Sequence, residues 1–425
     1  MKKRNAFTLI ELLAVIVILA VILVIAIPRI LDVIETSKKD SFKTSAQLIA
    51  DNAEKKKVSD KLLGKDEEIT CKDVAKISDE DYASCKITFD SDGIAKVSIV
   101  GKGKFKRLKV IDGTKENAEV KEITKPTYGM KATEYISNLL EYDGEGLKID
   151  NTSDQNIRYY GSDPNNYVSF NNELWRIIGV FGNNVKLVRS ESLGDLSWDS
   201  SASSVNNGRG VNEWSQSDLK NYLNTMYYGG TSVTCYNGKY DQTTTCPTNR
   251  LDETSKSLID NHIWNTGAPN DSTLYDSTTN SYDTVEFYKD ERGSLNGKIC
   301  TSGNWCNDTV TRKTEWTGYI GLPYVTDWAY ASSENDCNTK IDQSSTHKCK
   351  NNNWMQRDSG TWYLSPFAIP DDAGNVWVVV GDEGVSCNGA AFPLSTFPTI
   401  YLKSNILIES GKGTSSDPYI LKAGS

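Results

Sequence analysis

The chain opens with a short basic run, MKKRNA (residues 1–6), followed by an apolar run, FTLIELLAVIVILAVILVIAI (residues 7–27). As an α-helix, the apolar run is long enough to cross a hydrocarbon core of about 30 Å. A secretory signal peptide would have a shorter apolar stretch, small residues at its end and no acid at its start. The acid here is Glu11, and placing its ionised carboxylate in lipid costs roughly 2.5–3.5 kcal/mol. The segment therefore predicts a membrane helix whose carboxylate either reaches the interface or has a partner.

The basic leader, the small residue Ala6 and the run Phe7-Thr8-Leu9-Ile10-Glu11 together resemble the type IV prepilin processing motif. The resemblance implies that prepilin peptidase cleaves between Ala6 and Phe7 and that the new N-terminus is methylated. It also implies that Glu11 pairs with the α-amine of a neighbouring subunit. Pro28 matches a proline common in pilin helices, where it bends the helix near the membrane surface. Ala6 departs from the glycine that the family usually has before the cleavage site, but it is also small.

The same resemblance implies partners and a location. The partners would be other pilin subunits, prepilin peptidase and the pilus assembly platform in the membrane. Before assembly the chain would cross the cytoplasmic membrane once, and after assembly it would belong to a filament at the cell surface.

Beyond Pro28 the helical apolar period continues, which predicts one spine helix over residues 7–63 with an apolar face for a globular body. Gly64 is suited to end this helix. Alternating apolar residues on both sides of Asp92-Gly93 predict a hairpin within a small antiparallel β head, residues 64–125. All ten tryptophans come later in the chain, so we place a domain boundary near residue 125.

The nine cysteines indicate disulfides and therefore an exported, oxidising location. The first eight fall into neighbouring pairs, which we predict to be bonded as Cys71–Cys85, Cys235–Cys246, Cys300–Cys306 and Cys337–Cys349. The spacings are not those of a zinc ribbon, so we expect no metal site. Cys387 is left over, and it either stays a thiol or displaces one of these pairings.

Residues 126–425 are expected to form a large, loop-rich domain. Apolar runs predict strands at 173–181, 185–189, 376–380 and 399–403, and capped amphipathic runs predict helices at 216–226 and 252–264. The strand Glu173-Leu-Trp-Arg-Ile-Ile-Gly-Val-Phe181, together with late strands around Trp362 and Trp377, is similar to C-type lectin-like surface domains. The calcium–sugar signature of true lectins is absent, so calcium-dependent sugar binding is not implied. The fold class expected for the chain is α+β, a spine helix with a small β head followed by this large α+β domain.

Trp305, Trp328 and Trp354 lie in expected loops, where they would either form a stacking surface for a carbohydrate or protein ligand or fill the core. The two histidines, His262 and His347, belong to no catalytic motif, and the sequence has no G-x-S-x-G, H-E-x-x-H or Walker loop. We therefore expect no catalytic residue and no cofactor. The net charge of −9 argues against nucleic-acid contact by the large domain.

The leading functional hypothesis is a large minor pilin at a filament tip that displays residues 126–425 to a surface ligand, since a bulky head is awkward to repeat along a thin filament. One alternative is a pseudopilin subunit of a type II secretion or DNA-uptake machine. Another is a membrane-tethered hydrolase, which would need a pair of carboxylates in a cleft.

Overall fold

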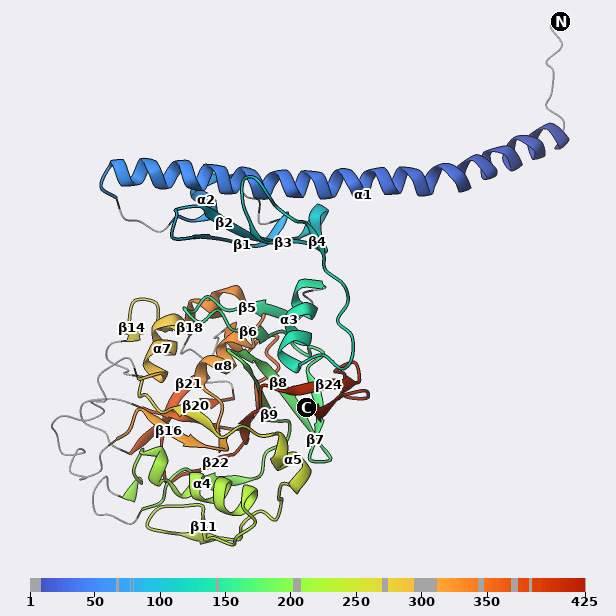
Figure 1. The fold of residues 1–425 in the computed structure, drawn as a ribbon. Helices are drawn as coiled ribbons and strands as arrows, with labels where there is room; N and C mark the ends of the chain where they lie inside the picture. Colours follow the sequence, from blue (N-terminus) through green and yellow to red (C-terminus); the bar gives the residue numbers. More distant parts are fainter. Residues whose placement is uncertain are drawn as a thin grey trace, which may run out of the picture. The chain divides into compact units, whose positions relative to one another are not determined.

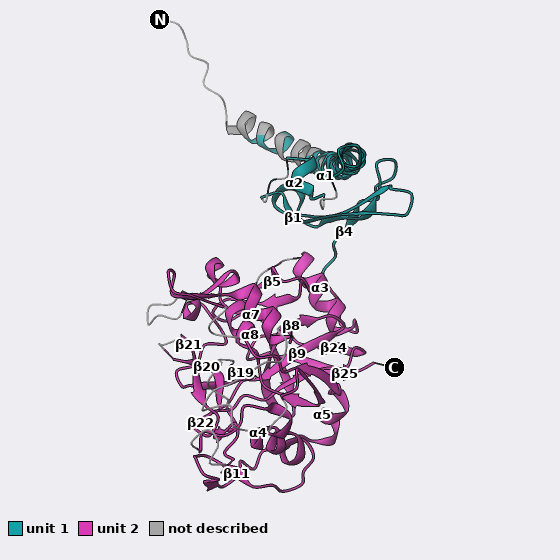
Figure 2. Ribbon diagram, turned by 90° about the vertical axis from the view of Figure 1, so that its left-hand side faces the viewer, with its two compact units in different colours: residues 1–125 teal, residues 126–425 magenta. Residues whose placement is uncertain are grey.

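A computed structural model describes the chain except for residues 1–8, 66–68, 77, 79, 143, 145, 202–207, 270–273, 294–311, 343–347, 368–373, 382–383 and 425. Of the side chains before Arg29, it describes those of Leu13, Ile16, Val17, Ile18 and Ile27. The chain divides into two compact units, Met1–Lys125 (unit 1) and Pro126–Ser425 (unit 2), coloured separately in Figure 2. The division falls after Lys125, and all ten tryptophans belong to unit 2.

Unit 1 consists of a long helix packed on a small antiparallel sheet (Figure 1). The helix is α1 (Leu9–Leu62), and Gly64 beyond its end has a φ of +67°. The sheet has the order β1-β2-β3-β4, with β1 (Tyr82–Phe89), β2 (Ala95–Gly101), β3 (Leu108–Gly113) and β4 (Lys121–Glu122). Two short elements complete the unit, α2 (Cys71–Val74) and the 3-10 turn η1 (Gly103–Phe105). A spine helix followed by a small antiparallel sheet is thus confirmed.

The helix and the sheet of unit 1 meet through two apolar faces. Alternate residues of β2 are fully buried, and so is a stripe of α1 spaced by three and four residues, which runs from Phe42 to Ala53. The ring of Phe42 lies 5.2 Å from that of Phe105 and 5.9 Å from that of Tyr82. The second half of α1 is therefore held in place by the core of unit 1.

The predicted turn joins β1 to β2. Asp90 accepts hydrogen bonds through Oδ1 from the backbone N–H of Asp92 at 3.0 Å and of Ile94 at 2.9 Å. Gly93 has a φ of +82°, a conformation that glycine adopts without steric cost. The local sequence thus determines where the hairpin turns.

Unit 2 is organised around two sheets (Figure 1). In the described residues the larger sheet has nine strands, with a main path β17-β23-β9-β8-β7-β25-β24 and with β6 joining β8 to β5. Its strands are β5 (Leu147–Ile149), β6 (Ile157–Tyr159), β7 (Tyr167–Phe170), β8 (Glu173–Phe181), β9 (Asn184–Arg189), β17 (Ile320–Gly321), β23 (Thr399–Tyr401), β24 (Ile406–Ser410) and β25 (Tyr419–Ala423).

The second sheet has the order β10-β22-β19-β20-β21. Its strands are β10 (Asp195–Ser197), β22 (Pro393–Ser395), β19 (Thr361–Pro366), β20 (Asn375–Val380) and β21 (Gly384–Gly389). Smaller ladders pair β11 (Cys235–Tyr236) with β12 (Thr243–Thr244), β13 (His262–Asn265) with β16 (Glu315–Gly318), and β15 (Ser281–Asp283) with β14 (Tyr275–Asp276) and β18 (Lys340–Asp342).

Short helices connect these strands. They are α3 (Ala132–Tyr142), η3 (Trp214–Gln216), α4 (Asp218–Asn221), the π-helical turn η4 (Tyr222–Tyr228), α5 (Glu253–Leu258), α7 (Thr284–Glu291), α8 (Val325–Tyr330), η5 (Asn335–Asn338) and η6 (Lys348–Lys350). The helix predicted at 216–226 is divided between η3, α4 and η4. Its N-cap is Ser217, whose hydroxyl oxygen accepts a hydrogen bond from the N–H of Lys220 at 3.2 Å.

The four strands predicted from apolar runs correspond to β8, β9, β20 and β23. The helix predicted at 252–264 is wrong beyond Leu258. Asp252 caps α5 as expected, but the chain becomes extended at Ile259, and the N–H of Asp260 donates to the carbonyl of Tyr401 at 2.8 Å. His262 then lies in β13, because pairing with distant strands outweighs local helix propensity.

Candidate functional site

The residues predicted to direct processing and assembly lie at the start of the chain. Ala6 and Phe7 are outside the described residues. Glu11 and Pro28 lie in α1, but their side chains are not described. In the part of the chain that the structure describes, no helix is apolar over a length sufficient to cross a membrane.

The first half of α1 carries apolar side chains that the single chain leaves uncovered. Ile27, Ile30, Leu31, Val33 and Ile34 are each between 48% and 68% exposed. Large contiguous apolar patches are uncommon on soluble monomers and usually mark contact surfaces for proteins or lipid. The exposed apolar residues of this half therefore form a surface suited to contacts with protein or lipid, whereas the second half belongs to the core of unit 1.

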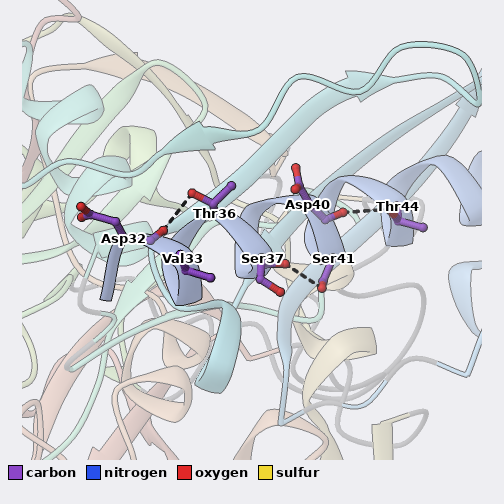
Figure 3. Close-up of a pocket in the computed structure, with 7 residues that line it drawn as sticks. All are labelled: Asp32, Val33, Thr36, Ser37, Asp40, Ser41 and Thr44. Carbon is purple, nitrogen blue, oxygen red and sulfur yellow. Dashed lines mark hydrogen bonds between the residues drawn. The ribbon is translucent and has the colours of Figure 1, made fainter. Parts of the chain in front are cut away.

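One exposed face of α1 is lined by small and acidic residues, which Figure 3 shows in close-up. The hollow along this face is lined by Asp32, Val33, Thr36, Ser37, Asp40, Ser41 and Thr44. The hydroxyls of Thr36, Ser41 and Thr44 each donate, at 2.8 Å, to the carbonyl oxygen four residues earlier in the helix. The hydroxyl groups of these three residues are thus satisfied within α1.

A short basic run, an apolar helix start containing one acid, and an uncovered helix face therefore occur in sequence at the N-terminus. Residues 1–27 match the prokaryotic N-terminal methylation motif. The methylation motif supports a type IV pilin-like or pseudopilin subunit, processed by prepilin peptidase and assembled with other pilin subunits. It also implies a membrane-anchored precursor that becomes part of a surface filament. The match is confined to the N-terminal segment and leaves unit 2 to be interpreted from its own geometry.

No curated protein and no solved structure matches the chain. The predicted resemblance of unit 2 to C-type lectin-like domains is therefore not supported.

Two of the tryptophans predicted as candidate ligand contacts lie in the core of unit 2. Trp328 is 0% exposed and Trp354 is 3% exposed. Their indole N–H groups donate to internal acceptors, from Trp328 to Oε1 of Gln356 at 3.0 Å and from Trp354 to the carbonyl of Tyr159 at 2.9 Å. A stacking role is therefore wrong for both, since each ring contributes buried area and each N–H is satisfied internally. Trp305 lies outside the described residues.

Three of the four predicted disulfides are present, which confirms their pairing. They are Cys71–Cys85, Cys235–Cys246 and Cys337–Cys349. Cys300 and Cys306 lie outside the described residues. Cys387 lies in β21, half-buried, with Nδ2 of Asn375 at 3.8 Å from its sulfur.

A chain of buried charges crosses unit 2. Asp327 of α8 accepts through Oδ1 from Nη1 of Arg158 on β6, and through Oδ2 from Nζ of Lys186 on β9, both at 2.6 Å. Arg158 also donates through Nε to Oδ2 of Asp150 at 2.8 Å. All four side chains are almost completely removed from solvent. Sequence patterns did not reveal this cluster, although a lysine within the apolar run of β9 is a signal that a buried partner exists.

Aromatic rings surround the two cations of this cluster. Nζ of Lys186 lies 4.0 Å from the ring centroid of Tyr324, and the guanidinium of Arg158 lies 4.3 Å from that of Phe181. Burial lowers the pKa of Lys186 to about 8, against the opposing attraction of Asp327. Burial alone would raise the pKa of Asp327, but Lys186 and Arg158 outweigh it and hold this pKa below its ordinary value. The cluster braces α8 against β6 and β9. Because its side chains are buried, a ligand in solvent cannot reach them.

Glu291, at the end of α7, makes the stability of unit 2 depend on pH. It is fully buried and accepts hydrogen bonds from the backbone N–H of Thr326 at 3.2 Å and from the Thr326 hydroxyl. Burial raises the pKa of Glu291 from 4.5 to about 7, although Arg292 opposes the shift. The folded chain therefore binds this proton more tightly than the unfolded chain. The contribution of Glu291 to stability is full below pH 4.5 and is lost as the pH rises to about 7.

The quantity to measure is the free energy of unfolding of the native chain minus that of Glu291→Gln. We expect this difference to fall by up to about 3 kcal/mol as the pH rises from 4.5 to about 7. Urea denaturation at several pH values, followed by tryptophan fluorescence, measures this difference for unit 2 alone, because every tryptophan lies in that unit. Glu286→Gln, on the exposed side of the same helix, is the control and should give a constant difference. A constant difference for Glu291→Gln as well would contradict the prediction.

Proposed function

We propose that the chain is a minor type IV pilin-like subunit, located at a filament tip, that displays unit 2 as an adhesion or ligand-binding domain. The observation that carries this proposal is the match of residues 1–27 to the methylation motif, which continues directly into a helix with an uncovered apolar face. In this role α1 packs against other subunits through its exposed apolar residues up to Ile34, and the second half of the helix supports unit 1.

The display role follows from the size and independence of unit 2. It has apolar cores of its own, separate from the core of unit 1, and two of the described disulfides. A domain of this size is awkward to repeat along a thin filament, and this favours a position at the tip. We propose that unit 2 acts by binding and not by catalysis.

The methylation motif fits equally well a pseudopilin subunit of a type II secretion or DNA-uptake machine. In that case unit 2 would contact other subunits of the machine and would have no external ligand. Labelling of sheared filaments with antibodies against unit 2 separates the two roles. We expect label at filament ends, whereas label along the whole length, or no label on any filament, would contradict the tip position.

Processing is tested by mass spectrometry of the protein from membranes and from sheared filaments. We expect the mature chain to begin at Phe7 and to carry a methyl group on its α-amine. A mature chain that keeps residues 1–6 would contradict the proposal, because the new amine is the group expected to pair with Glu11. An Ala6→Leu chain is the matched variant: its bulky residue before the cleavage site should leave the leader attached and the protein in the membrane.

A further inference from the structure

Unit 2 has a surface pocket of about 530 Å³ that the proposed assembly does not use. The pocket is lined by Tyr167 of β7, Arg176 of β8 and Arg189 of β9, and also by Arg357, which precedes β19. Three arginine side chains therefore line the same pocket, although the net charge of the chain is negative.

Two of these arginines already have counter-ions. Arg176 lies 3.0 Å from Asp163 through Nη2, and its Nε donates to Oδ1 of Asn166 at 2.8 Å. Arg189 lies 2.6 Å from Glu173 through Nε. Both guanidinium groups are therefore held as parts of the pocket wall.

Arg357 is different, because it forms no ion pair with any residue that the structure describes. Its Nη1 donates to the carbonyls of Trp354 at 3.0 Å and of Gln356 at 3.1 Å, and its guanidinium lies 4.9 Å from the ring centroid of Phe397. Burial lowers the pKa of Arg357. Carbonyl dipoles compensate a charge only in part, so a guanidinium drawn away from water is stabilised further by an anion.

Two more polar groups of the pocket form no hydrogen bond or contact ion pair with the residues that the structure describes. The hydroxyl oxygen of Ser190 is shielded from solvent and has no hydrogen-bond partner among the described residues. The carboxylate of Glu191 is exposed at the pocket and attracts the charges of Arg189 and Arg357 from a distance, without a contact ion pair within the described part of the chain. The pocket therefore offers a ligand a cation and a carboxylate acceptor, beside the partly exposed side chain of Leu174, whereas the Ser190 hydroxyl lies beneath its surface.

We propose that this pocket binds an acidic sugar, whose carboxylate pairs with Arg357. A carboxylate supplies the contact ion pair that Arg357 lacks among the described residues and matches the planar fork of a guanidinium. The hydroxyls of the sugar donate to Glu191, and its ring lies against Leu174. The inference names a ligand class for the display role of unit 2 and rests on that role.

The test uses the full chain, purified in detergent, with glucuronate as the probe in a calorimetric titration. Glucose has the same ring without the carboxylate, and acetate has a carboxylate without the sugar. We expect glucuronate to bind at least about tenfold more tightly than either, since charge-assisted hydrogen bonds are worth more than neutral ones. If glucose bound as tightly as glucuronate, the carboxylate would not contribute, and pairing with Arg357 would be excluded. If acetate bound as tightly as glucuronate, the sugar ring would not contribute, and an acidic sugar would be excluded as the ligand class. Absence of glucuronate binding overturns the proposal outright.

Arg357→Gln should weaken glucuronate binding at least about tenfold. Arg250→Gln is the matched control, because Arg250 is also half-buried and its Nη1 also donates to two nearby carbonyls, those of Pro247 and Asn249, but it does not line the pocket. Leu174→Ala removes an exposed apolar side chain that lines the pocket, so the variant should fold normally and weaken glucuronate binding about threefold. An unchanged affinity in Leu174→Ala, or in a folded Arg357→Gln, overturns the proposal.

Filament incorporation is scored for the same variants. Because these residues are in unit 2 and α1 is in unit 1, we expect each variant to be cleaved and incorporated normally. A variant that loses glucuronate binding but enters filaments normally shows that the pocket acts independently of assembly. If instead the native chain were not processed, the pilin-like role would be contradicted, whereas the result of the titration would still hold.

Discussion

A Glu11→Gln chain is expected to be cleaved before Phe7 and retained in the membrane, but to enter filaments at least about tenfold less efficiently than the native chain. Glutamine keeps the size of the side chain and removes its charge. In a bundle of apolar helices the attraction between a carboxylate and an α-amine is strong, because the surroundings screen it weakly. The measurement is the ratio of protein in sheared filaments to protein in membranes, by immunoblot.

The matched control for this prediction is Glu35→Gln, on the same helix. The carboxylate of Glu35 is exposed and lies 3.7 Å from Nζ of Lys39, one turn further along α1. Exposed pairs of this kind contribute little, so Glu35→Gln should enter filaments as the native chain does. If Glu11→Gln and Glu35→Gln were incorporated equally well, the pairing of Glu11 with a neighbouring amine would be excluded.

The features that could be predicted from the sequence are those carried by neighbouring residues. The prepilin-like motif is a continuous run, and residues 1–27 match the methylation motif on that basis. β8 and β20 are apolar runs, and the turn before β2 has Gly93 at the position that needs a positive φ. The disulfides were also predictable, because each bonded pair is at most 14 residues apart.

The features that could not be predicted depend on distant residues. Asp327 meets Lys186 and Arg158 across 141 and 169 positions, and no local pattern indicates which acid accompanies which base. The helix expected through His262 gave way to a strand for the same reason, since its partners are β16 and, at Ile259, a bridge to Leu402. Tryptophans in loops could either stack on a ligand or fill the core, and only the three-dimensional packing decides between these roles.

The charge cluster around Asp327 yields the largest expected change in stability. Asp327→Asn keeps the shape of the side chain but leaves Lys186 and Arg158 with one carboxylate, Asp150, in place of two. Removing one partner of a buried ion pair typically costs about 3–5 kcal/mol, because the remaining charge stays buried without compensation. We expect a loss of this size in the free energy of unfolding of unit 2, measured by urea denaturation and tryptophan fluorescence.

Two further chains make this prediction specific. Asp417→Asn disrupts an exposed pair, 3.8 Å from Lys412, and should cost less than about 1 kcal/mol. Lys186→Met removes the second charge, so the double variant with Asp327→Asn should lose clearly less stability than the sum of the two single variants, since neither charge is then left buried alone. Strictly additive losses, or a loss for Asp327→Asn no larger than for Asp417→Asn, would mean that Asp327 does not brace α8 against β6 and β9 through its charge.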